Sequence, residues 1–171
     1  MKAQLNIEFI LGVGIIVMIV SFIGFSIINN FPALHSESEY EVTKSKTFQV
    51  SQVLLSEKGN WTASNISNCS SMGLTDGEPY VLNASKVKAI DKCTDSEYIK
   101  LKDVLGLDMG NDLIINFTLL NFSGGSDTNY AECRPRTMSL TAAKFWIRRL
   151  VVIQNVTRDI AKMEVSVYGY G

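Results

Sequence analysis

The chain has 171 residues, with 16 basic and 17 acidic side chains and a formal net charge of −1. That length fits one globular domain in addition to an N-terminal apolar run, and the charge balance excludes binding to nucleic acid through net positive charge. Three cysteines and one histidine, with no CxxC spacing, exclude a structural zinc site, so we expect neither a metal nor a cofactor.

The first predicted element is a continuous apolar helix over about residues 4–29. The run Phe9–Ile28 contains no charged residue. Twenty helical residues at about 1.5 Å each span about 30 Å, the thickness of a hydrocarbon core, whereas the apolar part of a secretory signal has about 7–15 residues. The run is therefore expected to stay in a membrane, with the short N-terminus carrying Lys2 on the cytoplasmic side.

The region after this helix is predicted to change from connector to helix to loop. Pro32 predicts a kink or a helix end, and the polar and acidic residues 35–41 are typical of a connector. The apolar spacing over 48–55 favours a helix, which Gly59 is expected to end. Residues 60–79 are rich in Asn, Ser, Gly and Thr and predict a loop with at most a short strand.

Two short helices are predicted next. The first covers residues 85–92. The second begins at a capping-box pattern, Thr94 with Glu97 three residues later, and continues with apolar residues on one face until Gly106.

The last part of the chain predicts strands. Residues 113–122 and 144–154 are rich in β-branched and aromatic residues, and residues 123–129 between them predict a loop. After a turn at 155–159, apolar and polar residues alternate over 162–167, which predicts a hairpin with a polar outer face. These patterns predict an α+β fold, in which a long hydrophobic N-terminal helix projects from a globular head with short helices and an antiparallel β-sheet.

The head is unusually rich in sequons for N-glycosylation. A cluster of these motifs in a small domain indicates a surface outside the cell, where glycans shield and solubilise. The seven candidate sites are Asn60, Asn65, Asn68, Asn83, Asn116, Asn121 and Asn155.

The cysteines Cys69, Cys93 and Cys133 allow three alternative single disulfides, or free thiols. We expect Cys69–Cys93, because both lie in the irregular, turn-rich part of the head. Closing a loop of that size would stabilise the fold by about 3 kcal/mol in the chain-entropy model.

The carboxylate of Glu8 stands at the edge of the apolar run, where it is costly unless paired or placed in the interface. A peptidase cut between Ala3 and Gln4 would create an α-amine on Gln4, with Glu8 as the fifth residue of the mature chain. Residues one and five share a helix face. The amine of one subunit could also neutralise Glu8 of another in a staggered stack, which would set subunit register. The alternative is a plain signal anchor with an interfacial glutamate.

The stretch "KAQLNIEFILGVG" resembles the archaeal class III signal peptide of type IV pilin-like proteins. The resemblance rests on a basic residue, a small residue, Gln, a Glu four positions later and an uninterrupted apolar helix. It implies cleavage by a prepilin-type signal peptidase between Ala3 and Gln4 and a pilin-like lollipop fold. Ala3 replaces the glycine that is frequent at this position of the family. The segments "VSQVLLSEKGNW" and "SEYIKLKDVLGL" also resemble heads that follow such leaders, with no activity implied.

The expected organisation is a leader at 1–3, a hydrophobic helix and connector at 4–35, and an extracellular head at 36–171. The expected function is that of a minor or specialised pilin-like subunit of an archaeal cell-surface filament, anchored in the membrane and assembled with other pilin-like subunits through the N-terminal helix. The alternative is a non-polymerising, membrane-tethered binding or adhesion module. We do not expect an enzyme, because one histidine, His35 in the connector, leaves no Ser-His-Asp arrangement.

Overall fold

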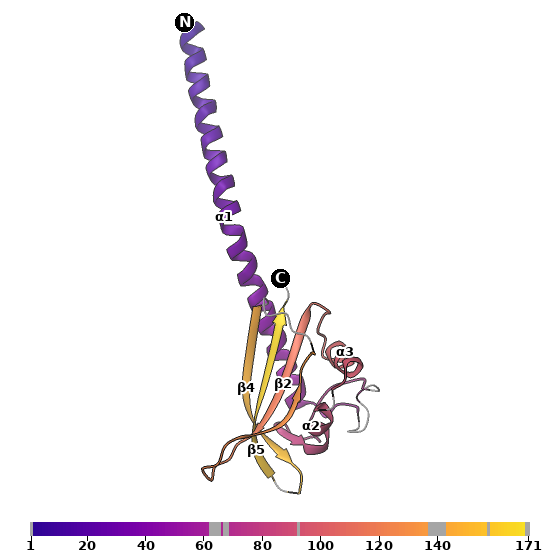
Figure 1. The fold of residues 1–171 in the computed structure, drawn as a ribbon. Helices are drawn as coiled ribbons and strands as arrows, with labels where there is room; N and C mark the ends of the chain where they lie inside the picture. Colours follow the sequence, from indigo (N-terminus) through magenta and orange to yellow (C-terminus); the bar gives the residue numbers. More distant parts are fainter. Residues whose placement is uncertain are drawn as a thin grey trace. The chain divides into compact units, whose positions relative to one another are not determined.

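The computed structural model describes residues 2–61, 66, 69–91, 93–136, 143–156 and 158–169, without the side chains of residues 2–6, 32–35 and 143–144. The chain divides into two compact units, Met1–Ser38 and Glu39–Gly171. We call the second unit the C-terminal domain. The architecture is α+β, as expected: a long apolar N-terminal helix, and a domain in which short helices accompany a five-stranded sheet (Figure 1).

Helix α1 runs from Lys2 to Ser56. The predicted helices at 4–29 and 48–55 are both part of it. The expected helix end at Pro32 and the expected connector at 35–41 are wrong, because the backbone stays helical through both. Proline removes only one helix hydrogen bond, at a cost of about 3 kcal/mol. The residues before Pro32 are apolar, and those after it are rich in Glu, Lys and Gln. Both sets favour helix strongly enough for α1 to continue through the proline.

The sheet has the strand order β1-β4-β5-β2-β3. Neighbouring strands are antiparallel except β1 and β4, which are parallel, so the sheet is mixed. The three predicted strands, β2, β4 and β5, form the expected antiparallel part. Strand β1 has three residues and follows an irregular loop, so its sequence carries no period-two signal. The strands are β1 Val81–Asn83, β2 Asn111–Leu119, β3 Thr128–Cys133, β4 Ala143–Gln154 and β5 Arg158–Gly169.

The predicted hairpin is β4 and β5, paired from Ala143↔Gly169 to Gln154↔Arg158. Its inward residues Met163, Val165 and Val167 are fully buried, as the alternation predicts. The outer face is polar at Arg148 and Glu164, whose side chains form an ion pair at 2.7 Å. Ser166 departs from this pattern and is buried, between Trp146 of β4 and Ile114 of β2 in the pairing register.

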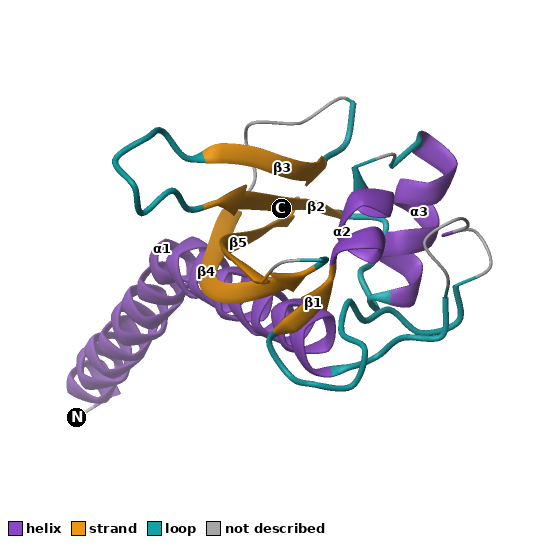
Figure 2. Ribbon diagram, turned by 90° about the horizontal axis from the view of Figure 1, so that it is seen from below, coloured by secondary structure: helices purple, strands orange, loops and turns teal. Residues whose placement is uncertain are grey.

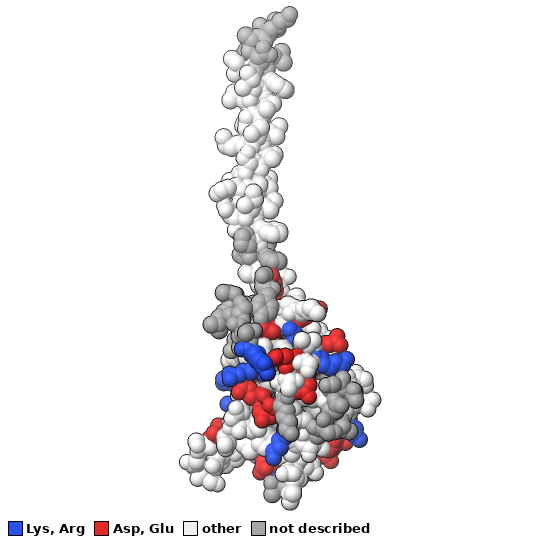
Figure 3. Space-filling model, turned by 45° about the vertical axis from the view of Figure 1, so that its right-hand side comes forward, with Lys and Arg blue, Asp and Glu red and all other residues white. Residues whose placement is uncertain are grey.

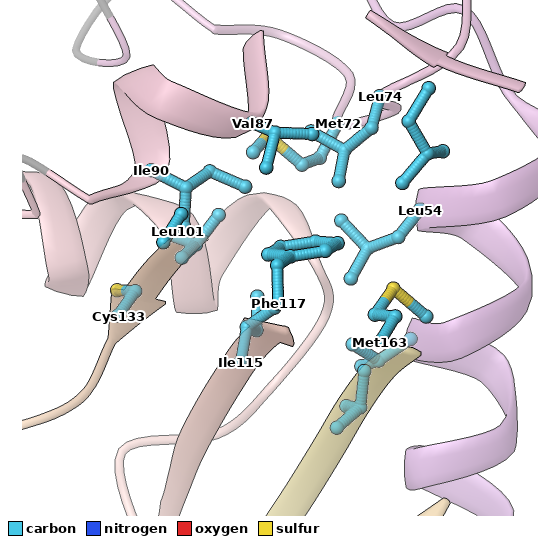
Figure 4. Packing of buried hydrophobic residues seen from close by; sticks show 14 of the residues in the cluster. Leu54, Met72, Leu74, Val87, Ile90, Leu101, Ile115, Phe117, Cys133 and Met163 are labelled. Carbon is cyan, nitrogen blue, oxygen red and sulfur yellow. The ribbon is translucent and has the colours of Figure 1, made fainter. Parts of the chain in front are cut away.

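One hydrophobic core joins the sheet to the helices. The same buried cluster contains Phe117 of β2, Leu54 of α1, Val87 and Ile90 of α2 (Ala84–Ile90), and Leu101 of α3 (Asp95–Val104) (Figure 4). Figure 2 shows α2 and α3 beside the β2 and β3 end of the sheet. The last turns of α1 together with α2 and α3 therefore cover the inner face of the sheet.

The two short helices begin at side-chain caps. In α2 (Ala84–Ile90), Asn83 Oδ1 accepts the backbone N–H of Ser85 at 2.8 Å. In α3 (Asp95–Val104), the predicted capping box is present, with the Glu97 carboxylate accepting the Thr94 backbone N–H at 3.0 Å. Gly106 follows α3 with φ +71°, a conformation that favours glycine. The sequence signals at both ends of α3 are thus confirmed.

We expect Thr94→Ala to lower the free energy of unfolding by about 1 kcal/mol, because the N-terminus of α3 loses a cap. The measurement is denaturant unfolding of the full chain in mild detergent. Thr94→Ser keeps the hydroxyl and should remain near the wild-type value. Equal stability of the Ala and wild-type proteins would contradict a stabilising cap.

The disulfide differs from the expected one. Cys93 pairs with Cys133, with 5.6 Å between their Cα atoms, and Cys69 is a free, buried cysteine. The expected Cys69–Cys93 pairing is therefore wrong. Cys93 follows α2 and Cys133 ends β3, two elements that contact each other in the fold although they are distant in sequence. Burial raises the pKa of the Cys69 thiol, which keeps it protonated at neutral pH.

Candidate functional site

The most distinctive surface of the chain is the apolar segment of α1, which we define as Ile7–Phe31. Every large hydrophobic side chain in it is exposed, from 43% at Val13 to 73% at Phe22. Burial of such a side chain is worth about 1.5–3 kcal/mol, so the segment as a whole would cost tens of kcal/mol in water. It requires an apolar environment outside its own fold.

Helix α1 is long and apolar enough to cross a membrane, with a mean hydropathy of 2.7 in its most apolar stretch. The helix is hydrophobic on all sides in this segment, which is typical of a helix that is surrounded by lipid or by other helices. On the face shown in Figure 3, no charged side chain interrupts the apolar segment, whereas Lys, Arg, Asp and Glu are interspersed over the C-terminal domain. The two parts of the chain therefore present surfaces of different chemistry.

Glu8 is the one charged residue of the apolar segment. Its side chain is exposed on α1. Gln4 lies one helical turn earlier, so the backbone atoms of the predicted processing site and the predicted assembly residue are on the same helix face. The side chains of Ala3 and Gln4 lie outside the described residues. A carboxylate at the edge of an apolar surface favours a cationic partner when that surface is buried.

The sequons fall into different environments. Asn60, Asn121 and Asn155 are exposed, Asn83 and Asn116 are half-buried, and Asn65 and Asn68 lie outside the described residues. Among the described sequons, exposure therefore leaves Asn60, Asn121 and Asn155 as candidate glycosylation sites.

Two acidic residues of the C-terminal domain, Asp108 and Asp127, have hydrogen-bond partners within the fold. Asp108 accepts a hydrogen bond from the Lys46 ammonium at 2.5 Å, and this contact holds the pKa of the Asp108 carboxyl below its usual range. Asp127 Oδ1 accepts the backbone N–H of Asn121 at 3.2 Å. Among the described residues, no group of three His, Cys, Asp or Glu side chains is arranged to hold a metal ion.

A buried polar cluster between α3 and β2 was missed by the sequence reasoning. The Tyr98 hydroxyl donates to Asp112 Oδ1 at 3.1 Å and accepts the backbone N–H of Leu113 at 2.8 Å, and Lys102 Nζ lies 3.5 Å from the same carboxylate. The spacing of Tyr98 and Lys102, four residues apart on one helix face, was the available signal. The cluster fixes α3 against the start of β2, so we assign it a structural role.

Comparison with known protein families, with curated proteins and with solved structures finds no match for this chain.

Proposed function

We propose that this chain is a minor or specialised pilin-like subunit of an archaeal type IV pilus-like filament at the cell surface. The observation that carries the proposal is the exposed apolar segment Ile7–Phe31 with a single carboxylate, Glu8, at its N-terminal edge. A segment of this kind suits two successive environments, a lipid bilayer before assembly and a bundle of like helices afterwards. The role is structural, with no catalytic step.

The proposed route begins with cleavage between Ala3 and Gln4 by a prepilin-type signal peptidase on the cytoplasmic side. The cut leaves the apolar segment on the mature chain and creates a cationic α-amine at its start. When the segment is packed among other helices, that amine neutralises Glu8 of an adjacent subunit. A buried carboxylate without a partner is costly, so this pairing sets the register between subunits.

The C-terminal domain is the part proposed to lie outside the cell. The sequons and the Cys93–Cys133 disulfide support that placement, because disulfides persist mainly in oxidising compartments. This domain would form the outer surface of the filament.

A second candidate function is a membrane-tethered binding or adhesion module that never polymerises. The same apolar segment favours it, because one span of this length is sufficient for stable anchoring. In that case Glu8 would lie at the headgroup level with no subunit partner.

Mechanical shearing of native cells separates the two functions. Filaments released by shearing and collected by ultracentrifugation should contain this chain, which a peptide antibody against the C-terminal domain would detect by immunogold labelling along or at the ends of the filaments. A chain that stays entirely in the membrane fraction, monomeric in mild detergent, would overturn the filament proposal and leave the tethered module.

A further inference from the structure

Two loops share one end of the sheet in the C-terminal domain. Residues 120–127 connect β2 to β3, and the described residues 155 and 156 follow β4 before β5 begins. The Leu120 backbone N–H donates to the Ile160 carbonyl at 3.0 Å, which joins the first loop to the start of β5. Residues of the first loop and of the start of β5, including Phe122 and Arg158, line one shallow groove. Figure 1 shows this end of the sheet away from the C-terminus.

Each loop exposes a large apolar side chain at its tip. Phe122 is 76% exposed and Val156 is 97% exposed. Phe122 and Val156 are also the middle residues of two sequons, Asn121-Phe122-Ser123 and Asn155-Val156-Thr157, and both asparagines are exposed.

The exposed Asn121 side chain is hydrogen-bonded within its own loop. Its Oδ1 accepts the Ser123 backbone N–H at 2.9 Å, which turns Nδ2 away from that bond. A Cβ on residue 125 would lie 2.3 Å from Nδ2, so the close approach of this side chain to the loop backbone requires glycine at position 125.

The other described sequons are engaged in the fold. Asn83 caps α2 with its oxygen, while its Nδ2 donates to Asp76 Oδ2 at 2.5 Å. Asn116 lies within β2, where its Oδ1 is buried and has no hydrogen-bond partner among the described residues. Its register neighbours are Glu132 on β3 and Glu164 on β5, so strands flank it on both sides.

Asn60 differs from Asn121 and Asn155 in the residue that follows it. The next residue, Trp61, is buried in the core, and its indole N–H donates to the Gly73 carbonyl at 2.9 Å. Among the described sequons, an exposed asparagine followed by an exposed apolar residue therefore occurs at Asn121 and Asn155.

We propose that Asn121 and Asn155 carry N-linked glycans that cover Phe122 and Val156, and that Asn83 and Asn116 stay unmodified. The donor is an oligosaccharide linked through phosphate to a membrane lipid. Asn Nδ2 forms a bond to the anomeric carbon, the bond from that carbon to the phosphate oxygen breaks, the lipid phosphate leaves and the amide gives up one proton to a base. The inference rests on the extracellular placement in the proposed function.

Peptide mass spectrometry of the full chain from native membranes tests the inference. We expect glycan mass on the peptides that contain Asn121 and Asn155, and unmodified peptides for Asn83 and Asn116. An unmodified Asn121 or Asn155, or a glycan on Asn83 or Asn116, would overturn it. Occupancy is measured whether the chain is found in filaments or in the membrane, so failure of the filament proposal is recorded separately.

Limited proteolysis with chymotrypsin tests the covering role. Cleavage after Phe122 should be slow in the native glycoprotein and severalfold faster in Asn121→Gln, because the loop tip is then exposed. Asn116→Gln is the matched control and should be cleaved at the native rate. Equal cleavage of the native protein and Asn121→Gln would contradict a glycan that covers Phe122.

Discussion

Glu8→Ala should abolish incorporation of the chain into filaments while leaving its level in the membrane unchanged. In the proposed assembly, Glu8 neutralises the α-amine of an adjacent subunit inside a bundle of apolar helices. Removing one partner of a buried ion pair costs about 3–5 kcal/mol, because the other charge stays buried without compensation. The equilibrium constant for adding a subunit should therefore fall roughly 100-fold or more, since each 1.4 kcal/mol is a factor of ten.

The controls for this prediction separate charge from packing. Glu8→Gln preserves the shape but removes the charge, so it should fail to assemble as Glu8→Ala does. Ser21→Ala changes a polar residue within the same apolar segment and should assemble normally. The measurement is the amount of chain in the sheared filament fraction relative to the membrane fraction. Normal filaments from Glu8→Ala would show that the carboxylate does not set register.

Loss of the Cys93–Cys133 disulfide should lower the free energy of unfolding of the C-terminal domain by about 4 kcal/mol. The bridge joins residues 40 positions apart in sequence, and closing a loop of that length gives this value in the chain-entropy model. The variant is Cys93→Ala with Cys133→Ala, compared with the wild type by denaturant unfolding of the full chain in mild detergent. Buried Trp61 provides the fluorescence signal.

The response to a reductant identifies the pairing. The wild-type protein and Cys69→Ala should both lose stability when a reductant is added, because both retain the bridge. The Cys93→Ala, Cys133→Ala variant should not respond. A Cys69→Ala protein that is insensitive to reductant would mean that Cys69 is one of the paired residues.

Local signals predicted much of the C-terminal domain. The capping box at Thr94 and the glycine at Gly106 bound α3 correctly, because caps act within a few residues of the helix end. The alternation at Met163, Val165 and Val167 predicted β5 and its buried face, because one strand already contains the period-two pattern.

The features that were missed or predicted wrongly depend mainly on contacts distant in sequence. Strand β1 exists because Val81–Asn83 pairs with residues 152–154 of β4, and three residues carry no periodicity of their own. The partner of Cys93 is decided by the contact of α2 with β3, which the sequence does not reveal. Helix α1 continues through Pro32, because the residues on both sides favour helix more than one proline disfavours it.

The candidate functional site could likewise be predicted only in part from the sequence. The apolar segment and Glu8 could be identified from the sequence, because a membrane-length helix depends on composition alone. The sequence could not predict which sequons are suited to glycosylation, because that depends on what surrounds each asparagine in the fold. Asn83 and Asn121 have equivalent motifs, yet one caps a helix and the other lies at an exposed loop tip.

The mature N-terminus tests the central proposal most directly. Intact mass and terminal peptide mapping of the chain from a membrane or filament fraction should give a start at Gln4, with the apolar segment retained. A start at Met1 would contradict processing by a prepilin-type peptidase and favour a simple anchor. A start beyond about residue 30 would contradict the whole account, because the helix that carries Glu8 would then be a cleaved secretory signal.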